Sequence, residues 1–302
     1  LFPLRRLQAR RLSAPSNHSY GHRSLIVAVQ GELGSNSELA AREYFASHAI
    51  EILPCFSFDD LFAAVADTRA DAAMAPVENS LAGSIHDVWD LFPRHPSIDV
   101  AGEIRLRVVH CLVGLPGAAL GDIQRVRSHP QALAQCGNYL AAMQGVTAEP
   151  VYDTAGAVQI IKSEGELSEA AIASAQAAAD HGMQILAEDL SAADNFTRFL
   201  VLGKGLPGGT AKTTVVLEIE DTAAALPAVL GAFVRHGIEV LKVETRKRIG
   251  RPWSYGVYLE FVGDTTAGAG QALQETRSIA TAVHIVGSYP SGTAAEPRLH
   301  RR

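Results

Sequence analysis

Between residues 24 and 202, short apolar runs alternate with amphipathic stretches. The apolar runs predict β-strands because polar or turn-forming residues bound them; they lie at 24–30, 51–55, 72–77, 108–115, 124–129, 148–153, 170–174 and 199–202. The amphipathic stretches predict helices at 38–47, 59–68 and 130–143. This alternation predicts an α/β fold with largely parallel strands.

A second kind of unit follows a segment rich in glycine and proline. That segment, residues 204–211, predicts a linker. Beyond it the order is strand, helix, two strands, helix and a last strand, over about 80 residues, which is typical of a ferredoxin-like fold. This unit shows no obvious catalytic cluster, so we expect it to be regulatory.

The composition is that of a globular protein. Of 302 residues, 47% are hydrophobic and 19% are charged, which supports a buried core and favours two domains. No apolar run approaches the roughly 18 residues that a membrane span needs, so we expect no membrane protein. Cys55, Cys111 and Cys136 lack CxxC spacing, which argues against a disulfide framework or zinc cluster and favours reduced thiols inside a cell.

The formal net charge of −6 is unevenly distributed. Residues 1–24 carry five arginines and no acid, whereas the remainder carries 21 basic and 32 acidic side chains. An acidic body does not suit nucleic acid, whose phosphates require many Lys and Arg contacts. We interpret residues 1–24 as a disordered or targeting leader and residues 291–302 as a solvated tail. We expect the chain in the cytoplasm, or in an organelle stroma if the leader is a transit peptide.

Small or polar residues join a strand to a helix at five places: 34–38, 78–84, 128–132, 153–157 and 174–178. In parallel α/β folds such strand ends line a ligand crevice, and helix N-termini there attract anions. Ser37, Ser80 and Thr154 are candidates for binding a carboxylate or for capping alone, and His129 for a ligand contact or an ordinary hydrogen bond. The repetition predicts an anion-binding cleft.

The segment DNFTRFLVLG, residues 194–203, gives the sharpest chemical signal. In it, Thr197 can donate a hydrogen bond to an oxygen that gains charge during a reaction. Arg198 can pair with a carboxylate through two hydrogen bonds. Judged from chemistry alone, the favoured interpretations are structural: Arg198 forms a surface salt bridge, and Thr197 is present because threonine favours β-strands. GxxxxGK[ST], HExxH and GxSxG motifs are absent, as is a GxGxxG that opens a helix after a strand, which disfavours a nucleotide or metal enzyme.

Together these motifs resemble those of prephenate dehydratases. The segments that carry the resemblance are, in order, AVQGELGSNSELAA, APVENSLAGS, SHPQALAQC, YDTAGAV, AAIAS and DNFTRFLVLG. The unit after the linker resembles the ACT domain that accompanies this family. The resemblance covers roughly residues 25–290.

The resemblance implies a catalytic domain at 25–203 with two periplasmic-binding-protein-like α/β lobes, and an ACT regulatory domain at 212–290. The active site would lie between the lobes. It implies conversion of prephenate to phenylpyruvate, water and carbon dioxide in phenylalanine biosynthesis, with no metal or organic cofactor. It also implies a homodimer or homotetramer that phenylalanine regulates.

By the same resemblance, Thr197 assists the departing hydroxide and Arg198 binds a carboxylate or organises the site. The implied substrate-binding residues are Ser37, Glu78, Asn79, Ser80, His129, Thr154 and Phe199. The implied effector residues are Ala224, Ala225, Leu226, Glu244, Thr245 and Arg246. The first effector segment lacks the family's glycine and the second lacks its proline, which predicts weak or absent inhibition by phenylalanine.

Two alternative functions remain open. An arogenate dehydratase accepts an amino group where prephenate has a keto group, and a transit peptide would favour that activity. A non-catalytic sensor of small molecules would use the same two-lobed cleft. The intact motif from Thr197 to Phe199 and the lack of a secretory signal argue against the sensor.

Overall fold

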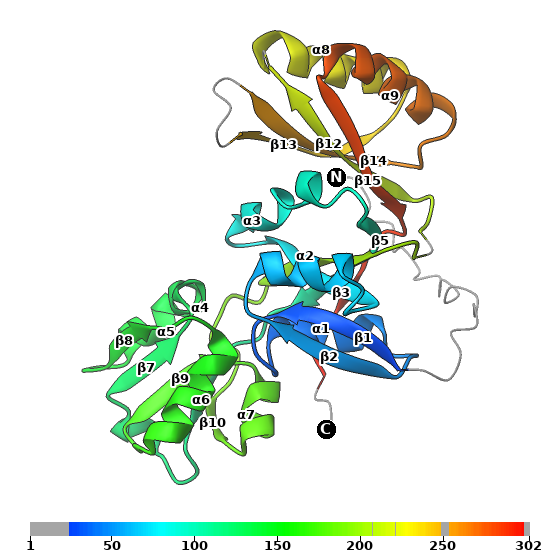
Figure 1. Ribbon diagram of the computed structural model, residues 1–302. Coiled ribbons are helices and arrows are strands. Elements are labelled where there is room, and N and C mark those ends of the chain that lie inside the picture. Colours follow the sequence, from blue (N-terminus) through cyan, green and yellow to red (C-terminus); the bar gives the residue numbers. More distant parts are fainter. Residues whose placement is uncertain (1–23, 207, 221, 249–253, 299–302) are drawn as a thin grey trace, which may run out of the picture.

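The computed structural model describes residues 24–206, 208–220, 222–248 and 254–298. The leader expected at 1–24 lies outside this range except for its last residue. Two α/β lobes and a C-terminal domain make up the described chain (Figure 1). Within the described ranges, no helix is both long and apolar enough to cross a membrane.

The first lobe contains a sheet in the order β16-β5-β11-β3-β1-β2, with β4 beside β3. Strands β2, β1 and β3 are parallel, whereas β11 is antiparallel to both β3 and β5. The strands are β1 (Leu25–Gln30), β2 (Ile50–Cys55), β3 (Ala72–Asn79), β4 (Gly83–Ser84), β5 (Asp99–Arg107), β11 (Phe196–Gly203) and β16 (Thr293–Ala295). The helices are α1 (Asn36–Tyr44), α2 (Phe58–Ala66), α3 (His86–Trp89) and the 3-10 turn η1 (Phe92–Arg94).

The second lobe is inserted between β5 and β11 and has the strand order β10-β6-β9-β7-β8. Strands β8, β7 and β9 are parallel, and β6 and β10 are antiparallel additions. The strands are β6 (Cys111–Gly114), β7 (Arg125–Ser128), β8 (Thr147–Pro150), β9 (Glu169–Ala173) and β10 (Gln184–Ala187). The helical segments are η2 (Leu120–Asp122), α4 (Pro130–Gln135), α5 (Gly137–Ala142), α6 (Thr154–Glu164) and α7 (Ala175–His181).

The α/β class is confirmed, but the expectation of largely parallel strands holds for only one end of each sheet, β3-β1-β2 in the first lobe and β9-β7-β8 in the second. The chain leaves the first lobe after β5 and returns through β11, which therefore enters the sheet in the opposite direction. The helix expected at 130–143 is two helices, since Cys136 caps α4 and precedes α5. Strand β5 was not predicted from the sequence, because Glu103 and Arg105 interrupt its apolar positions.

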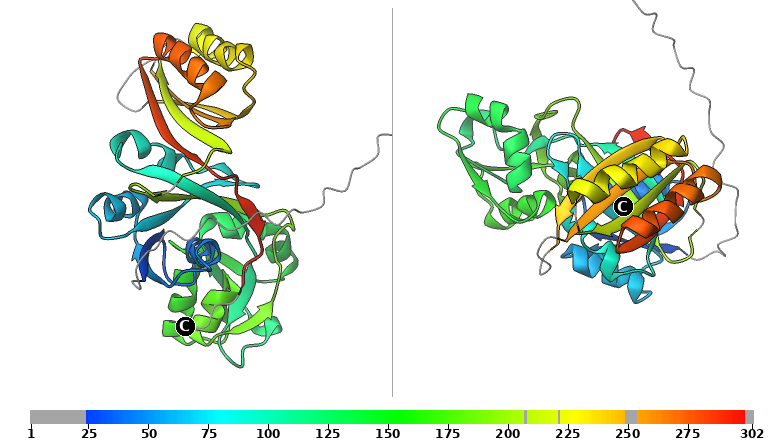
Figure 2. Two further views of the ribbon diagram at one scale, coloured as in Figure 1. Left: turned by 90° about the vertical axis from the view of Figure 1, so that its right-hand side faces the viewer. Right: turned by 90° about the horizontal axis from the view of Figure 1, so that it is seen from above.

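The C-terminal domain is a four-stranded antiparallel sheet, ordered β13-β14-β12-β15, with two helices on one face (Figures 1 and 2). Its elements are β12 (Lys212–Ile219), α8 (Thr222–Arg235), β13 (Val240–Lys247), β14 (Tyr255–Val262), α9 (Ala267–Ile279) and β15 (Ala282–Tyr289). This is the predicted βαββαβ order. Alternate positions of the strands pack on the helices, for example Leu217 and Phe261 on Phe233.

The other face of this sheet packs on the first lobe. Trp89 of α3 and Tyr258 of β14 have ring centroids 5.2 Å apart, and buried side chains of both domains form one apolar cluster. The chain then returns to the first lobe, where β16 pairs in parallel with β5. The expectation of a solvated tail at 291–302 is therefore wrong for residues 293–295, because the edge of β5 supplies backbone partners for them. Residues 299–302 lie outside the described ranges.

Candidate active site

Residues of both lobes line a cavity of about 300 Å³. The first lobe contributes the end of β1, the start of α1 and parts of β3 and β11, and the second contributes α4 and the start of α6. Six of the residues singled out from the sequence line this cavity: Ser37, Asn79, His129, Thr154, Thr197 and Phe199. Three others, Glu78, Ser80 and Arg198, are absent from its lining.

The lobes touch at the loop between β1 and α1. The hydroxyl of Ser174 donates to the carbonyl of Gly34 at 2.7 Å, and the carboxylate of Asp153 accepts from the backbone N–H of Glu32 at 3.2 Å. Gly34 has φ +88°, and a Cβ there would lie 2.8 Å from Cα of Ala177 in the second lobe. Glycine therefore permits both the backbone conformation and the close approach of the lobes.

The N-termini of α1 and α6 reach the cavity from opposite lobes. Ser35 caps α1, and Asp153 caps α6 by accepting from the backbone N–H groups of Ala155 and Gly156. The first residues of both helices line the cavity. Among the lining residues that the structure describes, none is Lys or Arg. The helix dipoles and free N–H groups are therefore the source of positive potential for an anionic ligand.

The hydroxyl of Thr197 lies beside the side-chain amide of Asn79. Nδ2 of Asn79 is 3.0 Å from Oγ1 of Thr197. The orientation of this amide is fixed, because its Oδ1 accepts from the backbone N–H groups of Leu81 and Ala82, each at 3.0 Å. Asn79 is therefore the donor and Thr197 the acceptor. Among the described residues, this is the one hydrogen bond of the Thr197 hydroxyl, so its own hydrogen is available to a ligand.

Three residues of the network around Asn79 carry no signal in the sequence pattern. Gln135 donates to Oδ1 of Asn79 at 3.2 Å, and Asn195 accepts from its Nδ2 at 2.8 Å. Nε2 of His110 contacts Oε1 of Gln135 at 2.8 Å. Burial lowers the pKa of His110 and outweighs the opposite effect of Gln135, which favours the neutral ring. Gln135 and Asn195 lie within segments that carry the family resemblance, but isolated amides have no spacing that marks them.

His129 lines the cavity in a defined tautomer. It is the N-cap of α4, and its Nδ1 accepts from the backbone N–H of Gln131 at 3.2 Å. In the neutral ring the proton therefore lies on Nε2. His129 can donate one hydrogen bond to a ligand from that nitrogen.

Arg198 lies on the opposite face of the sheet from the cavity. Side chains alternate along a strand, so Thr197 and Phe199 face the cavity and Arg198 between them faces the C-terminal domain. Its guanidinium donates to both carboxylate oxygens of Glu260. Of the two roles expected for Arg198, this placement argues against binding a substrate carboxylate and leaves the role of organising the site.

The two other residues absent from the cavity lining also have different partners. Glu78 pairs with Lys242 of the C-terminal domain at 3.0 Å. The hydroxyl of Ser80 donates to the carbonyl of Asp194 and accepts from the backbone N–H of Phe196. Ser80 therefore braces the segment that leads into β11.

The residues proposed for an effector do not come together. Glu244 contacts Lys242 and His86, and Arg246 pairs with Asp90, all at the interface with the first lobe. Thr245, between them on the strand, is exposed. The other segment, Ala224, Ala225 and Leu226, belongs to α8, and Ala225 and Leu226 pack into the core on the opposite face of the sheet.

The cysteines are buried thiols of low reactivity. Burial raises the pKa of Cys111 to about 11 and that of Cys136 to about 12, so neither forms a thiolate readily at neutral pH. Cys55 is also free and buried. Among the described residues, no group of three or more His, Cys, Asp or Glu side chains is arranged to hold a metal ion.

Comparison with known proteins identifies related sequences and structures. Residues 27–206 match the family described as prephenate dehydratase. Arogenate dehydratase/prephenate dehydratase 2, chloroplastic, of Arabidopsis thaliana is 38% identical over 282 residues, covering 88% of this chain and 73% of that protein. Arogenate dehydratase 2 of Petunia hybrida is 38% identical over 288 residues, covering 88% of this chain and 72% of that protein.

Two solved structures have a TM-score of 0.79 against this chain. One is prephenate dehydratase from Arthrobacter aurescens in complex with L-Phe, which is 28% identical and covers 88% of this chain and 89% of that one. The other is GqqA, described as a novel type of quorum quenching acylase. It is 33% identical, and the match covers 88% of this chain and 98% of that one.

Proposed function

The chain belongs to the prephenate dehydratase family, and we propose that its cleft converts prephenate to phenylpyruvate with Thr197 as the donor to the departing hydroxyl. The enzyme is a carbon–oxygen lyase of phenylalanine biosynthesis. The observation that carries the proposal is the hydrogen bond from Asn79 to Thr197. Because Thr197 accepts from this amide, its own O–H is free to donate toward the cavity.

The reaction needs an oriented substrate and help for one leaving group. The bond between the ring and its carboxylate breaks, carbon dioxide departs, and the electron pair enters the ring. The ring hydroxyl leaves with the electrons of its C–O bond and takes up a proton to become water. A hydrogen bond from Thr197 stabilises the charge that develops on that oxygen, and solvent supplies the net proton. An unperturbed threonine is a poor acid, so hydrogen-bond donation is its proposed role.

The substrate carries two carboxylates, and two of the helix N-termini at the cavity, those of α1 and α6, reach it from opposite lobes. We assign the carboxylates to the starts of α1 and α6, where Ser37 and Thr154 line the cavity. Each helix terminus contributes roughly 0.3–1 kcal/mol to binding an anion at an exposed site. His129 can donate to either carboxylate or to the keto oxygen from Nε2, and Phe199 packs against the ring.

The choice between prephenate and arogenate depends on how the site receives a keto group or an ammonium group. Asp153 is the one acid among the described residues that line the cavity, and it already accepts from three backbone N–H groups. An ammonium group would therefore find no uncommitted carboxylate, whereas a keto oxygen can accept from the donors present. We infer that prephenate is preferred.

The test is to measure kcat/KM for both substrates with the purified chain. Phenylpyruvate from prephenate and phenylalanine from arogenate are quantified separately. A higher kcat/KM for prephenate supports the inference. A higher value for arogenate assigns the chain to the arogenate dehydratase activity in the names of its plant relatives. No turnover of either substrate refutes the proposed function.

The acylase described for GqqA is a weaker candidate for this chain. Acyl transfer by a side-chain nucleophile needs a base within hydrogen-bond reach. Among the described residues of the cavity, neither His110 nor His129 contacts a Ser or Thr hydroxyl. Incubation with an N-acyl amide is therefore expected to give no free amine.

We propose that the C-terminal domain is an ACT domain with little response to phenylalanine. In this chain the two candidate effector segments are separated by the sheet, and Glu244 and Arg246 already pair at the interface. Dehydratase rates with and without millimolar phenylalanine test this. Complete inhibition at micromolar phenylalanine would contradict it.

Assembly into a homodimer or homotetramer is proposed on the edge strand β13. Leu241 and Val243 of that strand are exposed, and the backbone groups of an edge strand can pair with another chain. Light scattering of the purified chain and of Val243→Lys measures the mass. A monomeric wild type would refute the proposal, and dissociation of the variant would support this surface.

Location in an organelle stroma is proposed from two observations. Residues 1–24 are rich in Arg and free of acid, and relatives from Arabidopsis thaliana are described as chloroplastic. A fusion of residues 1–24 to a fluorescent protein, imaged in plant cells, tests this. Fluorescence spread through the cytoplasm would favour the cytoplasmic alternative.

A further inference from the structure

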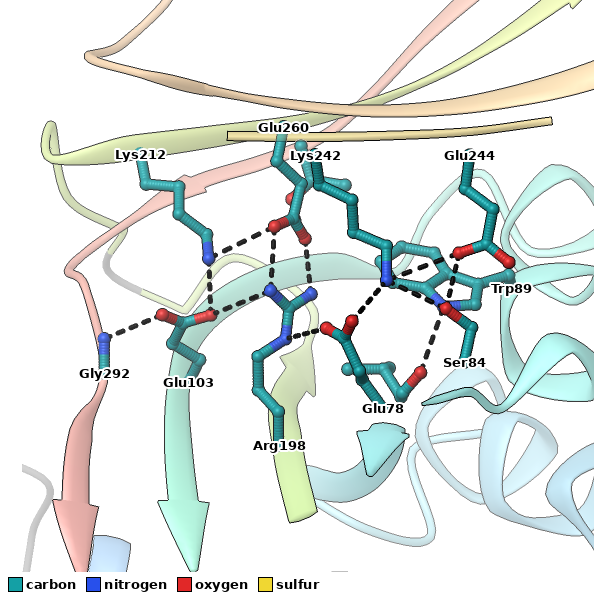
Figure 3. A network of polar contacts seen from close by, with 12 residues as sticks. Glu78, Ser84, Trp89, Glu103, Arg198, Lys212, Lys242, Glu244, Glu260 and Gly292 are labelled. Atoms are coloured by element: carbon teal, nitrogen blue, oxygen red, sulfur yellow. Dashed lines mark hydrogen bonds and ion pairs between the residues drawn. The ribbon is translucent and has the colours of Figure 1, made fainter. Parts of the chain in front are cut away.

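A network of charged side chains joins the first lobe to the C-terminal domain behind the active-site sheet (Figure 3). Arg198 of β11 donates to Glu260 of β14 at 2.8 Å through Nη1, and Lys212 of β12 lies 3.3 Å from the same carboxylate. Lys212 is also 2.8 Å from Glu103 of β5. Lys242 of β13 pairs with Glu78 of β3 in the same way. Strands β12, β13 and β14 of the C-terminal sheet therefore face β3, β5 and β11 of the first lobe.

The network contacts the immediate neighbours of two active-site residues. Arg198 follows Thr197 on β11, and Glu78 precedes Asn79 on β3. These four residues are also paired across the two strands, Thr197 with Asn79 and Arg198 with Glu78. Because side chains alternate along a strand, Thr197 and Asn79 face the cavity, whereas Arg198 and Glu78 face the C-terminal domain.

Glu260 is the main partner of Arg198. Side-chain exposure is 12% for Arg198 and 2% for Glu260, so both charges are largely removed from water. Nε of Arg198 is 3.7 Å from Glu78 and Nη1 is 3.8 Å from Glu103, beyond hydrogen-bond distance. Burial raises the pKa of Glu260, but Arg198 and Lys212 lower it by more, so the carboxylate is ionised at neutral pH.

We propose that Glu260 and Lys242 of the C-terminal domain are positioning residues for the dehydratase site, which fix Thr197 through Arg198 and Asn79 through Glu78. The inference rests on the proposed role of Thr197. Without Glu260, the buried guanidinium turns toward Glu103 or Glu78, and β11 shifts with it. The donor hydroxyl then moves away from the leaving oxygen, while the helix termini that bind the carboxylates belong to other elements and stay in place.

The test is the steady-state kinetics of Glu260→Gln, which removes the charge and keeps the shape. We expect kcat to fall roughly tenfold or more, because a misplacement of about 1 Å can cost on the order of 10²-fold. We expect KM to change less than kcat, since the carboxylates bind at α1 and α6 and only the apolar contact of Phe199 with the ring lies on β11. Lys242→Gln is expected to act in the same direction through Glu78, and it serves as the readout if Glu260→Gln does not fold.

Asp90→Asn is the matched control. Asp90 pairs with Arg246 and accepts from Tyr258 across the same interface, but it is the C-cap of α3 and does not lie on a strand of the site. Its kcat is expected to stay within about twofold of the wild type. A comparable loss of kcat in Asp90→Asn and Glu260→Gln would overturn the proposal, because general docking of the domain would then explain both.

The double variant R198Q/E260Q separates positioning from simple loss of charge. Two amides can hydrogen-bond to each other, and no guanidinium is left without its carboxylate. We expect its kcat to exceed that of Glu260→Gln. A wild-type kcat in folded Glu260→Gln, or a double variant no better than the single one, would refute the proposal. An inactive wild type would instead count against the proposed function.

Discussion

Replacing Thr197 by valine removes the donor hydroxyl and keeps the shape of the side chain. Asn79 loses one acceptor, but its Nδ2 keeps Asn195 at 2.8 Å and the carbonyl of Phe196 at 3.2 Å. Both amide hydrogens therefore remain satisfied. The lost hydrogen bond costs about 0.5–1.5 kcal/mol of stability, which lowers the unfolding midpoint by only a few degrees.

The effect on turnover is expected to be much larger. Removal of one preorganised donor to a developing negative charge typically costs about 2.7–4 kcal/mol, or roughly 10²–10³-fold in kcat. Thr197→Ser keeps the hydroxyl beside Asn79 and loses only a methyl group. We therefore expect Thr197→Ser to retain kcat within about tenfold of the wild type and Thr197→Val to lie far below it.

The assay is the initial rate of phenylpyruvate formation at saturating prephenate, with thermal unfolding of each variant as the folding control. Thr197→Val that unfolds close to the wild type and turns over within about threefold of it would remove Thr197 from the mechanism. Equal losses in Thr197→Val and Thr197→Ser would show that the side-chain shape matters and the hydroxyl does not.

Gly34→Ala is expected to lower kcat/KM about tenfold or more, because the new Cβ would lie 2.8 Å from Cα of Ala177 and force the lobes apart. Gly117→Ala is the control for backbone strain, since Gly117 has φ +90° and open space around it. Equal losses of kcat/KM in the two variants would contradict the prediction. Burial lowers the pKa of His110 in the folded protein. As the pH falls, this side chain therefore binds a proton in the unfolded protein at a higher pH than in the folded protein. The contribution of neutral His110 to the free energy of unfolding is therefore fully present above its pKa of about 6.5 in the unfolded protein and decreases below that pH. Unfolding midpoints between about pH 7 and 5.5 should accordingly fall less in His110→Gln, and an unchanged slope would exclude His110 as the titrating group.

The sequence carried much of the fold and the identity of the cleft. The period of its apolar positions distinguished the α/β region from the βαββαβ unit, because both patterns arise from local backbone geometry. The cavity contains Ser37, Asn79, Thr154 and Thr197, which the sequence marked at strand ends and helix starts. Such positions converge because connections leave a sheet at its strand ends.

The amide network around Asn79 is an example of what the sequence did not reveal. Gln135 and Asn195 lie far from Asn79 along the chain and meet it only after the lobes come together. A single Gln or Asn has no local pattern, since its partners are set by packing between elements. The return of the chain to form β16 likewise depends on an open edge of β5 that only the folded sheet provides.

The placement of Arg198 shows where sequence and tertiary structure divide. The strand pattern alone determined that Thr197 and Arg198 point to opposite faces, because side chains alternate along any β-strand. It did not determine which face borders the cavity. Docking of the C-terminal domain decided that, because Glu260, 62 residues further along the chain, neutralises the buried guanidinium on the far face.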